Sequence, residues 1–106
     1  MEFLREARPM YKVREIQDVS RPICKRYIGH IEVDKKNKTD VKRAIVGATS
    51  EIRKAKDPCH VAWLYVWHEE KLLCRTAWVD KDFTEAPLPL PLDYNDHEGD
   101  IGIVWM

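Results

Sequence analysis

Cysteine is scarce in this sequence: there are three, an odd number, spread through apolar stretches at positions 24, 59 and 74. Small secreted domains stapled by disulfides carry more cysteines and carry them in pairs. Long apolar runs are lacking too, because no segment approaches the ~20 residues of a membrane span. The start, MEFLREARPMYK, has no apolar run typical of a signal peptide. We therefore expect a cytoplasmic protein with free thiols and no membrane contact.

A net charge is also missing, since Lys and Arg together number 18 and so do Asp and Glu. This balance removes any general electrostatic attraction to a polyanion such as nucleic acid. The charge is nevertheless unevenly distributed. Residues 1–79 carry 17 basic and 11 acidic side chains, whereas residues 80–106 carry one basic and seven acidic. We expect the acidic end to fold back on the basic part or to meet the basic part of a neighbouring molecule.

Signatures of catalysis and cofactor binding are absent as well. The four glycines form no phosphate-binding loop, and neither Ser20 nor Ser50 lies in the glycine-flanked turn of a nucleophilic serine. His60 and His68 stand at the two ends of one apolar stretch; on a strand that rises ~3.3 Å per residue they would lie roughly 26 Å apart, too far to share a zinc ion. The sequence therefore predicts no catalytic residue, no metal site and no cofactor, and we do not expect an enzyme.

The clearest element that is present is an amphipathic helix at residues 39–57, TDVKRAIVGATSEIRKAKD. Apolar residues recur there at three- and four-residue steps, which puts them on one side of a helix. Thr39 is placed to cap its start, and Pro58 prevents its continuation. The predicted buried stripe consists of Val41, Ala44, Ile45, Ala48, Ile52 and Ala55.

The segments around this helix favour β-strands, because they alternate polar and apolar residues or are rich in valine and aromatic residues. A last apolar stretch, GIVWM at 102–106, is a possible fifth strand. The expected fold is thus a single α+β domain over residues 1–106, with the order ββαββ(β) and one helix packed on an antiparallel sheet. The four predicted strands are residues 11–16, 25–33, 59–68 and 72–79.

The two strands after the helix are expected to form a hairpin. With a two-residue turn at Glu69 and Glu70, Trp67 faces Leu72. Two-residue hairpin turns favour Asn-Gly or Asp-Gly over Glu-Glu, so a loop one or two residues longer is the alternative. The same register puts an aromatic row on one sheet face and Ala62 and Ala77 on the other, where they would pack against the alanine-rich helix. The row consists of Trp63, Tyr65, Trp67 and Trp78.

Residues 85–106 are predicted to be an extension that packs on the sheet or on a partner. Its Pro-Leu run, PLPLPL, must be extended because proline restricts its own φ and the residue before it. Leu88 and Leu90 are its candidate contact residues. The sequence leaves open whether this extension covers its own sheet or that of another copy.

A soluble protein rarely leaves a large aromatic surface in water. The expected function is therefore a protein-interaction or assembly module whose aromatic face and C-terminal tail bind a second copy, as in a homodimer, or another protein. The alternative is a single-stranded nucleic-acid-binding module, because strand aromatics flanked by Arg and Lys can stack unpaired bases. The predicted partner-binding residues are Trp63, Tyr65, Trp67, Trp78, Leu88 and Leu90.

Overall fold

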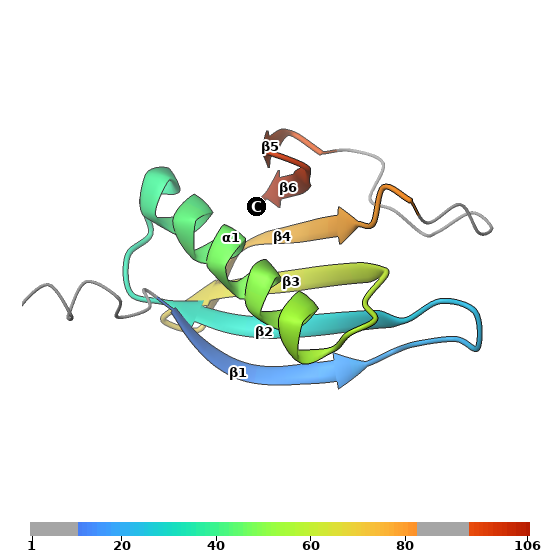
Figure 1. Cartoon of the computed structure of the whole chain (residues 1–106). Coiled ribbons are helices and arrows are strands. Elements are labelled where there is room, and N and C mark those ends of the chain that lie inside the picture. The colour runs from blue at the N-terminus through green and yellow to red at the C-terminus, as the bar shows by residue number, and fades with distance from the viewer. Residues whose placement is uncertain (1–10, 83–93) are drawn as a thin grey trace, which may run out of the picture.

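The computed structural model describes residues 11–82 and 94–106. They form a sheet with the strand order β1-β2-β3-β4-β6-β5, and one helix lies across one face of it (Figure 1). The predicted α+β class, with one helix packed on a mostly antiparallel sheet, is confirmed. The elements are β1 (Tyr11–Asp18), β2 (Arg26–Val33), α1 (Lys38–Ala55), β3 (Val61–His68), β4 (Lys71–Val79), β5 (Asp96–Glu98) and β6 (Ile101–Trp105).

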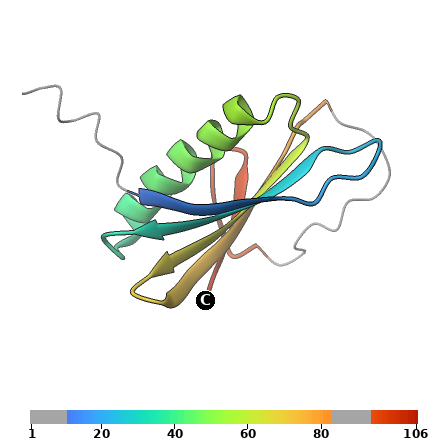
Figure 2. The ribbon, with the colours of Figure 1, turned by 90° about the horizontal axis from the view of Figure 1, so that it is seen from below.

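One strand pair departs from the antiparallel arrangement. β2 and β3 are parallel, whereas the other neighbouring strands are antiparallel. Parallel strands need a crossover connection, and α1 provides it between β2 and β3 (Figure 2). The helix therefore packs mainly over β1, β2 and β3, on one face of the sheet.

The helix begins one residue earlier than its predicted cap. Asn37 is the N-cap, and its side chain accepts a hydrogen bond from the Asp40 backbone N–H at 2.9 Å, so the prediction of Thr39 as cap is wrong. Asparagine satisfies an unpaired N–H of the first turn as well as threonine does. Ala55 in the last turn is exposed, which corrects the predicted stripe at that end. The buried helix residues are Val41, Ala44, Ile45, Ala48, Thr49 and Ile52.

The core lies between this stripe and the sheet face below it. Ile31 of β2 and Leu64 of β3 are fully buried there, and Ile103 of β6 extends the same layer. At the edge of the sheet, the Tyr11 hydroxyl donates a hydrogen bond to Glu51 Oε1 at 2.6 Å and ties β1 to the helix. Burial, together with the nearby Glu51 carboxylate, raises the pKa of Tyr11 to about 12.

The β3–β4 hairpin has the predicted two-residue turn. Glu69 and Glu70 adopt φ values of 48° and 66°, and Trp67 pairs with Leu72 as expected. Two positive φ values in succession define the turn type that matches the right-handed twist of a hairpin. Beyond Trp67, however, a bulge shifts the pairing, so that Val66 lies opposite Cys74.

This bulge reverses the faces predicted for most of β4. An extra residue in one strand moves every later side chain to the other side of the sheet. Trp78 consequently pairs with Ala62 and lies on the helix side at 4 % exposure, and Ala77 lies on the side away from the helix. The prediction that Trp78 shares a face with Trp63 is therefore wrong, and so is the predicted packing of Ala77 against the helix.

The turn itself offers a test of the local backbone. We expect Glu70→Gly to raise the free energy of unfolding by about 1 kcal/mol, because glycine has no Cβ to strain at φ 66°. Glu70→Ala removes the same carboxylate but keeps a Cβ, so it should give no such gain. Urea unfolding of the two variants measures the difference, and equal stabilities would show that the turn is not strained.

The C-terminal extension contributes two strands to the sheet. β6 pairs with β4, and β5 folds back on β6 as a short hairpin. The Asp96 carboxylate accepts hydrogen bonds from the Trp105 indole N–H and from the His97 backbone N–H. It also pairs with Lys42 of α1 at 3.1 Å. These contacts hold the pKa of Asp96 far below the ordinary value of an aspartate. Within residues 11–82 and 94–106, no helix is long and apolar enough to cross a membrane.

Candidate interaction surface

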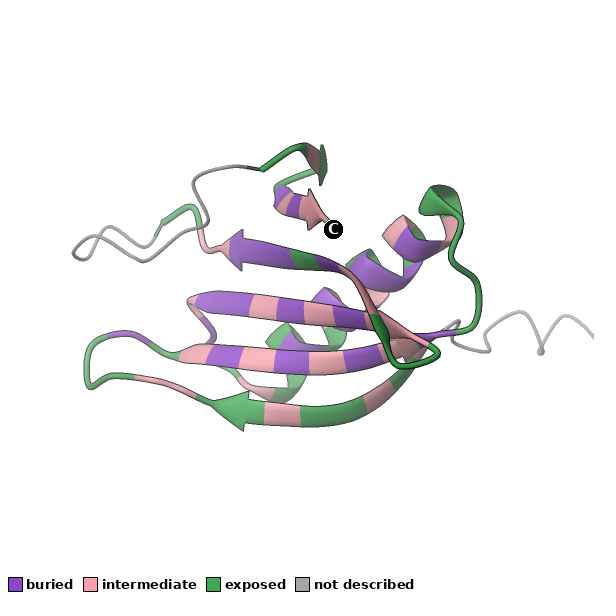
Figure 3. Ribbon diagram, turned by 180° about the vertical axis from the view of Figure 1, so that it is seen from behind, coloured by how far each residue is buried: buried purple, intermediate pink, exposed green. Residues whose placement is uncertain are grey.

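The sheet face away from α1 is the candidate functional site, and we call it the open face (Figure 3). Along β2 and β3, buried residues on the helix side mostly alternate with partly exposed residues on this face, although Val61 of β3 and Ala77 of β4 also lie on this face and are buried. Its members are Lys12, Arg14, Glu15 and Gln17 of β1, Arg26, Ile28, His30 and Glu32 of β2, Val61, Trp63, Tyr65 and Trp67 of β3, Leu72, Arg75, Ala77 and Val79 of β4, and Gly102 and Val104 of β6.

The centre of the open face is an aromatic row on β3. Trp63, Tyr65 and Trp67 occupy alternate positions, and all three are partly exposed. β3 suits such residues because aromatic side chains pack well on a pleated, half-buried surface. Since β3 lies between β2 and β4, the row runs along the middle of the sheet and not along an edge.

Two arginines, Arg14 of β1 and Arg26 of β2, lie against the ends of this row. The guanidinium of Arg26 lies 5.7 Å from the centroid of the Trp63 ring, and that of Arg14 lies 5.9 Å from the centroid of the Trp67 ring. Arg14 also pairs with Glu32 at 3.5 Å. Cation–π contacts between arginine and tryptophan at exposed sites each stabilise the fold by about 0.5–1 kcal/mol. They hold the cations of the β1–β2 side close to the aromatic row.

His30 fills the space beside the middle of the row. Its ring centroid lies 5.1 Å from that of Tyr65, and its Nδ1 accepts a hydrogen bond from the Trp67 indole at 3.4 Å. The other ring nitrogen, Nε2, lies 3.3 Å from Gln17 Oε1. The two ring nitrogens of His30 and the Trp67 indole N–H thus all have partners within this cluster.

Arg75 differs from Arg14 and Arg26 of the open face, which lie against tryptophan rings. It is exposed on β4, directly opposite Tyr65 on one side and Val104 on the other. Among the residues that the structure describes, no ion pair or side-chain hydrogen bond engages its guanidinium. Arg75 therefore offers a free cation in the apolar part of the open face.

Tyr94 extends the aromatic surface toward β6. A Cβ built on Gly102 would lie 2.4 Å from the Tyr94 ring, so only glycine leaves room for that ring. Gly102 pairs with Ala77, which in turn pairs with Trp63. Tyr94 is 39 % exposed and adds a further aromatic side chain on the same side of the sheet.

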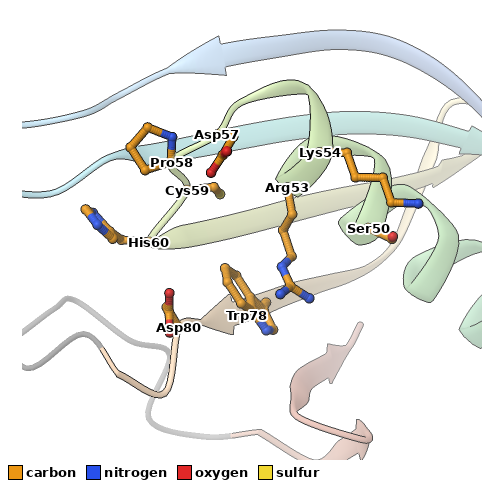
Figure 4. A pocket seen from close by; sticks show the side chains of 9 residues that line it. All are labelled: Ser50, Arg53, Lys54, Asp57, Pro58, Cys59, His60, Trp78 and Asp80. Atoms are coloured by element: carbon orange, nitrogen blue, oxygen red, sulfur yellow. The ribbon is translucent and has the colours of Figure 1, made fainter.

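A cavity of about 480 Å³ lies on the other side of the sheet, at the carboxyl end of α1 (Figure 4). At its floor the Arg53 guanidinium stacks 4.0 Å from the centroid of Trp78, whose indole donates to Asp100 at 3.0 Å. Cations and carboxylates both line this cavity, so its charge favours neither an anionic nor a cationic ligand. The lining residues are Ser50, Arg53, Lys54, Asp57, Pro58, Cys59, His60, Trp78 and Asp80.

The cysteines are free and buried at all three positions, as expected from the sequence. Burial raises the pKa of Cys59, in the wall of this cavity, to about 11, and that of Cys74 to about 12. A thiol with such a pKa is almost wholly protonated at neutral pH and is a poor nucleophile. Within the described ranges, no group of three or more potential ligand side chains is placed to hold a metal ion.

The structure brings together part of the predicted site. Trp63, Tyr65 and Trp67 share the open face, Trp78 lies on the opposite side, and Leu88 and Leu90 lie outside the described residues. Sequence reasoning missed the neighbours that come from other strands. Only the alternation of β2 pointed to His30, while nothing local placed the following residues on the open face: Arg14, Ile28, Arg75 and Tyr94.

Comparison with known protein families, with curated proteins and with solved structures finds no match for this chain.

Proposed function

We propose that this protein is a cytoplasmic protein-interaction module without catalytic activity, and that the open face is its binding surface. The observation that carries the proposal is the aromatic row of Trp63, Tyr65 and Trp67 in the middle of a sheet face that the helix does not cover. Tryptophan, tyrosine and arginine are the residues that most often dominate the binding energy of protein interfaces. The three free cysteines fit a reducing compartment.

The charges of the open face suit binding to a second copy. A two-fold contact brings the same patch of both molecules together, so the patch must contain both signs of charge. Zero net charge also removes long-range repulsion between copies. The face provides four cations and two carboxylates, namely Lys12, Arg14, Arg26 and Arg75 with Glu15 and Glu32.

The test is the mass of the protein in solution as a function of concentration. We expect the wild-type chain to self-associate and Tyr65→Ala to weaken this by a factor of about 30 or more, the effect of removing an interface anchor. Val46→Ala is the matched control, because Val46 is an apolar side chain on α1 that is 44 % exposed on the other side of the sheet. Light scattering after size-exclusion chromatography measures the mass of the wild-type protein and of the two variants.

Two results would contradict the proposal. A wild-type chain that remains monomeric at every concentration does not use the open face to bind itself. Equal losses in Tyr65→Ala and Val46→Ala would show that association does not depend on this face. Circular dichroism of both variants confirms that each is folded before its mass is compared.

A single-stranded nucleic acid is the second candidate partner, because the open face combines a row of aromatic side chains with four cations. Three contacts weigh against it: Arg14 is paired with Glu32, Arg26 lies against the Trp63 ring, and Arg14 lies against the Trp67 ring. Titration with a single-stranded oligonucleotide distinguishes the candidates. Binding that weakens steeply with added salt would favour nucleic acid.

A further inference from the structure

The open face has two halves of different chemistry. Over β1 and β2 it is polar, and the arginines there lie against tryptophan rings, one of them also paired with Glu32. Over β3, β4 and β6 it is apolar and aromatic, with Arg75 as its cation. A ligand that fits the second half must be largely apolar and must bring a negative charge. The partly exposed apolar members on these three strands are Trp63, Tyr65, Trp67, Leu72, Val79 and Val104.

Extended proline-rich segments meet the first requirement. They dock on surfaces lined by aromatic side chains, and they lose little conformational entropy on binding because proline restricts the free chain. The sequence of this chain contains one such segment, EAPLPLPLD at 85–93, with a carboxylate at each end. Its leucines supply apolar contacts, and Glu85 and Asp93 supply the negative charge.

We infer that the open face binds the Pro-Leu segment, residues 85–93, of a second copy of this chain, and that Arg75 pairs with a carboxylate of that segment. This inference rests on the function proposed above and names the partner. It follows from the free guanidinium of Arg75, which has no carboxylate partner among the described residues of its own chain.

Charge complementarity between copies favours the same arrangement. Residues 1–79 carry a net charge of +6 and residues 80–106 carry −6. In a two-fold dimer, each acidic end meets the basic part of its partner, and both contacts form at once. The docked segment would lie on the apolar half of the open face, beside the aromatic row.

Charge reversal in two different molecules tests the inference directly. Arg75→Glu alone, and the double variant E85R/D93R alone, should each weaken self-association by about tenfold or more, as loss of an interfacial ion pair does. Mixed in equal amounts, the two variants should associate again. In the mixed dimer, the carboxylate introduced by Arg75→Glu faces the arginines introduced by E85R/D93R, and the other contact keeps the native pair. Light scattering after size exclusion measures the mass of each sample.

Arg43→Glu is the matched control, because Arg43 is exposed on the outer side of α1. It changes net charge as Arg75→Glu does, but it should not affect association. Failure of the mixture to associate would overturn the inference, and so would full association of Arg75→Glu. A wild-type monomer would overturn both this inference and the proposed function. If Tyr65→Ala dissociates the wild-type dimer while charge reversal does not, only the Pro-Leu partner is wrong.

Discussion

Alanine at Ile45 or at Ile52 is expected to lower the free energy of unfolding by about 2–5 kcal/mol. Both side chains lie on the buried stripe of α1, Ile45 at 0 % exposure and Ile52 at 1 %. Truncation removes several buried carbons and leaves a cavity that a close-packed interior fills only partly. Ile52 also packs closely against β2, because a Cβ added to Gly29 would lie only 2.6 Å from the Ile52 Cδ1.

The control for these variants is Arg43→Ala on the exposed side of the same helix. Arginine and alanine have similar helix propensity, so this change should alter the free energy of unfolding by about 0.5 kcal/mol or less. Urea unfolding of the three variants provides the comparison. Similar losses at Arg43 and Ile45 would mean that the buried face of the helix has been assigned incorrectly.

Trp78→Ala is expected to lower the free energy of unfolding by about 3–5 kcal/mol. Trp78 is 4 % exposed on the helix side of the sheet, is stacked by Arg53 and donates its indole N–H to Asp100. Alanine would remove the ring from the core and would leave the Arg53 guanidinium without its aromatic partner. Trp78→Phe keeps a ring and loses the hydrogen bond, so it should cost less than Trp78→Ala does.

Trp67→Ala is the matched comparison, because Trp67 is only partly buried on the open face. We expect Trp67→Ala to lower the free energy of unfolding by about 1 kcal/mol, which is typical of a partly exposed site. Thermal or urea unfolding of the two tryptophan variants therefore separates the two faces of the sheet. Equal losses would contradict the placement of Trp78 in the core.

Local sequence patterns predicted the elements of this fold well. The three- and four-residue repeat of Val41, Ala44, Ile45, Ala48 and Ile52 predicted the buried side of α1 correctly. Alternation predicted β2, and the two glutamates at 69 and 70 were correctly identified as the hairpin turn. These features depend on residues a few positions apart, so the sequence alone carries the information.

Pairing over long distances was predicted less well. The parallel pairing of β2 with β3 depends on how α1 crosses the sheet, and the residues of the two strands do not predict it. That contact places His30 beside Tyr65, so the composition of the open face could not be assembled from strand patterns alone. Tyr94 belongs to the same class, because its place over Gly102 depends on the fold of the β5–β6 hairpin.

Side chains on a strand alternate with a period of two, and this local rule is enough to predict that Trp63, Tyr65 and Trp67 share one side of β3. Which other side chains join them depends on how the strands pair in the folded sheet. The bulge between Val66 and Trp67 transfers Trp78 to the core and brings Arg75 to the open face. A one-residue change of register reverses every later side chain. The aromatic row is thus a property of β3 alone, whereas the free cation beside it is a property of the folded sheet.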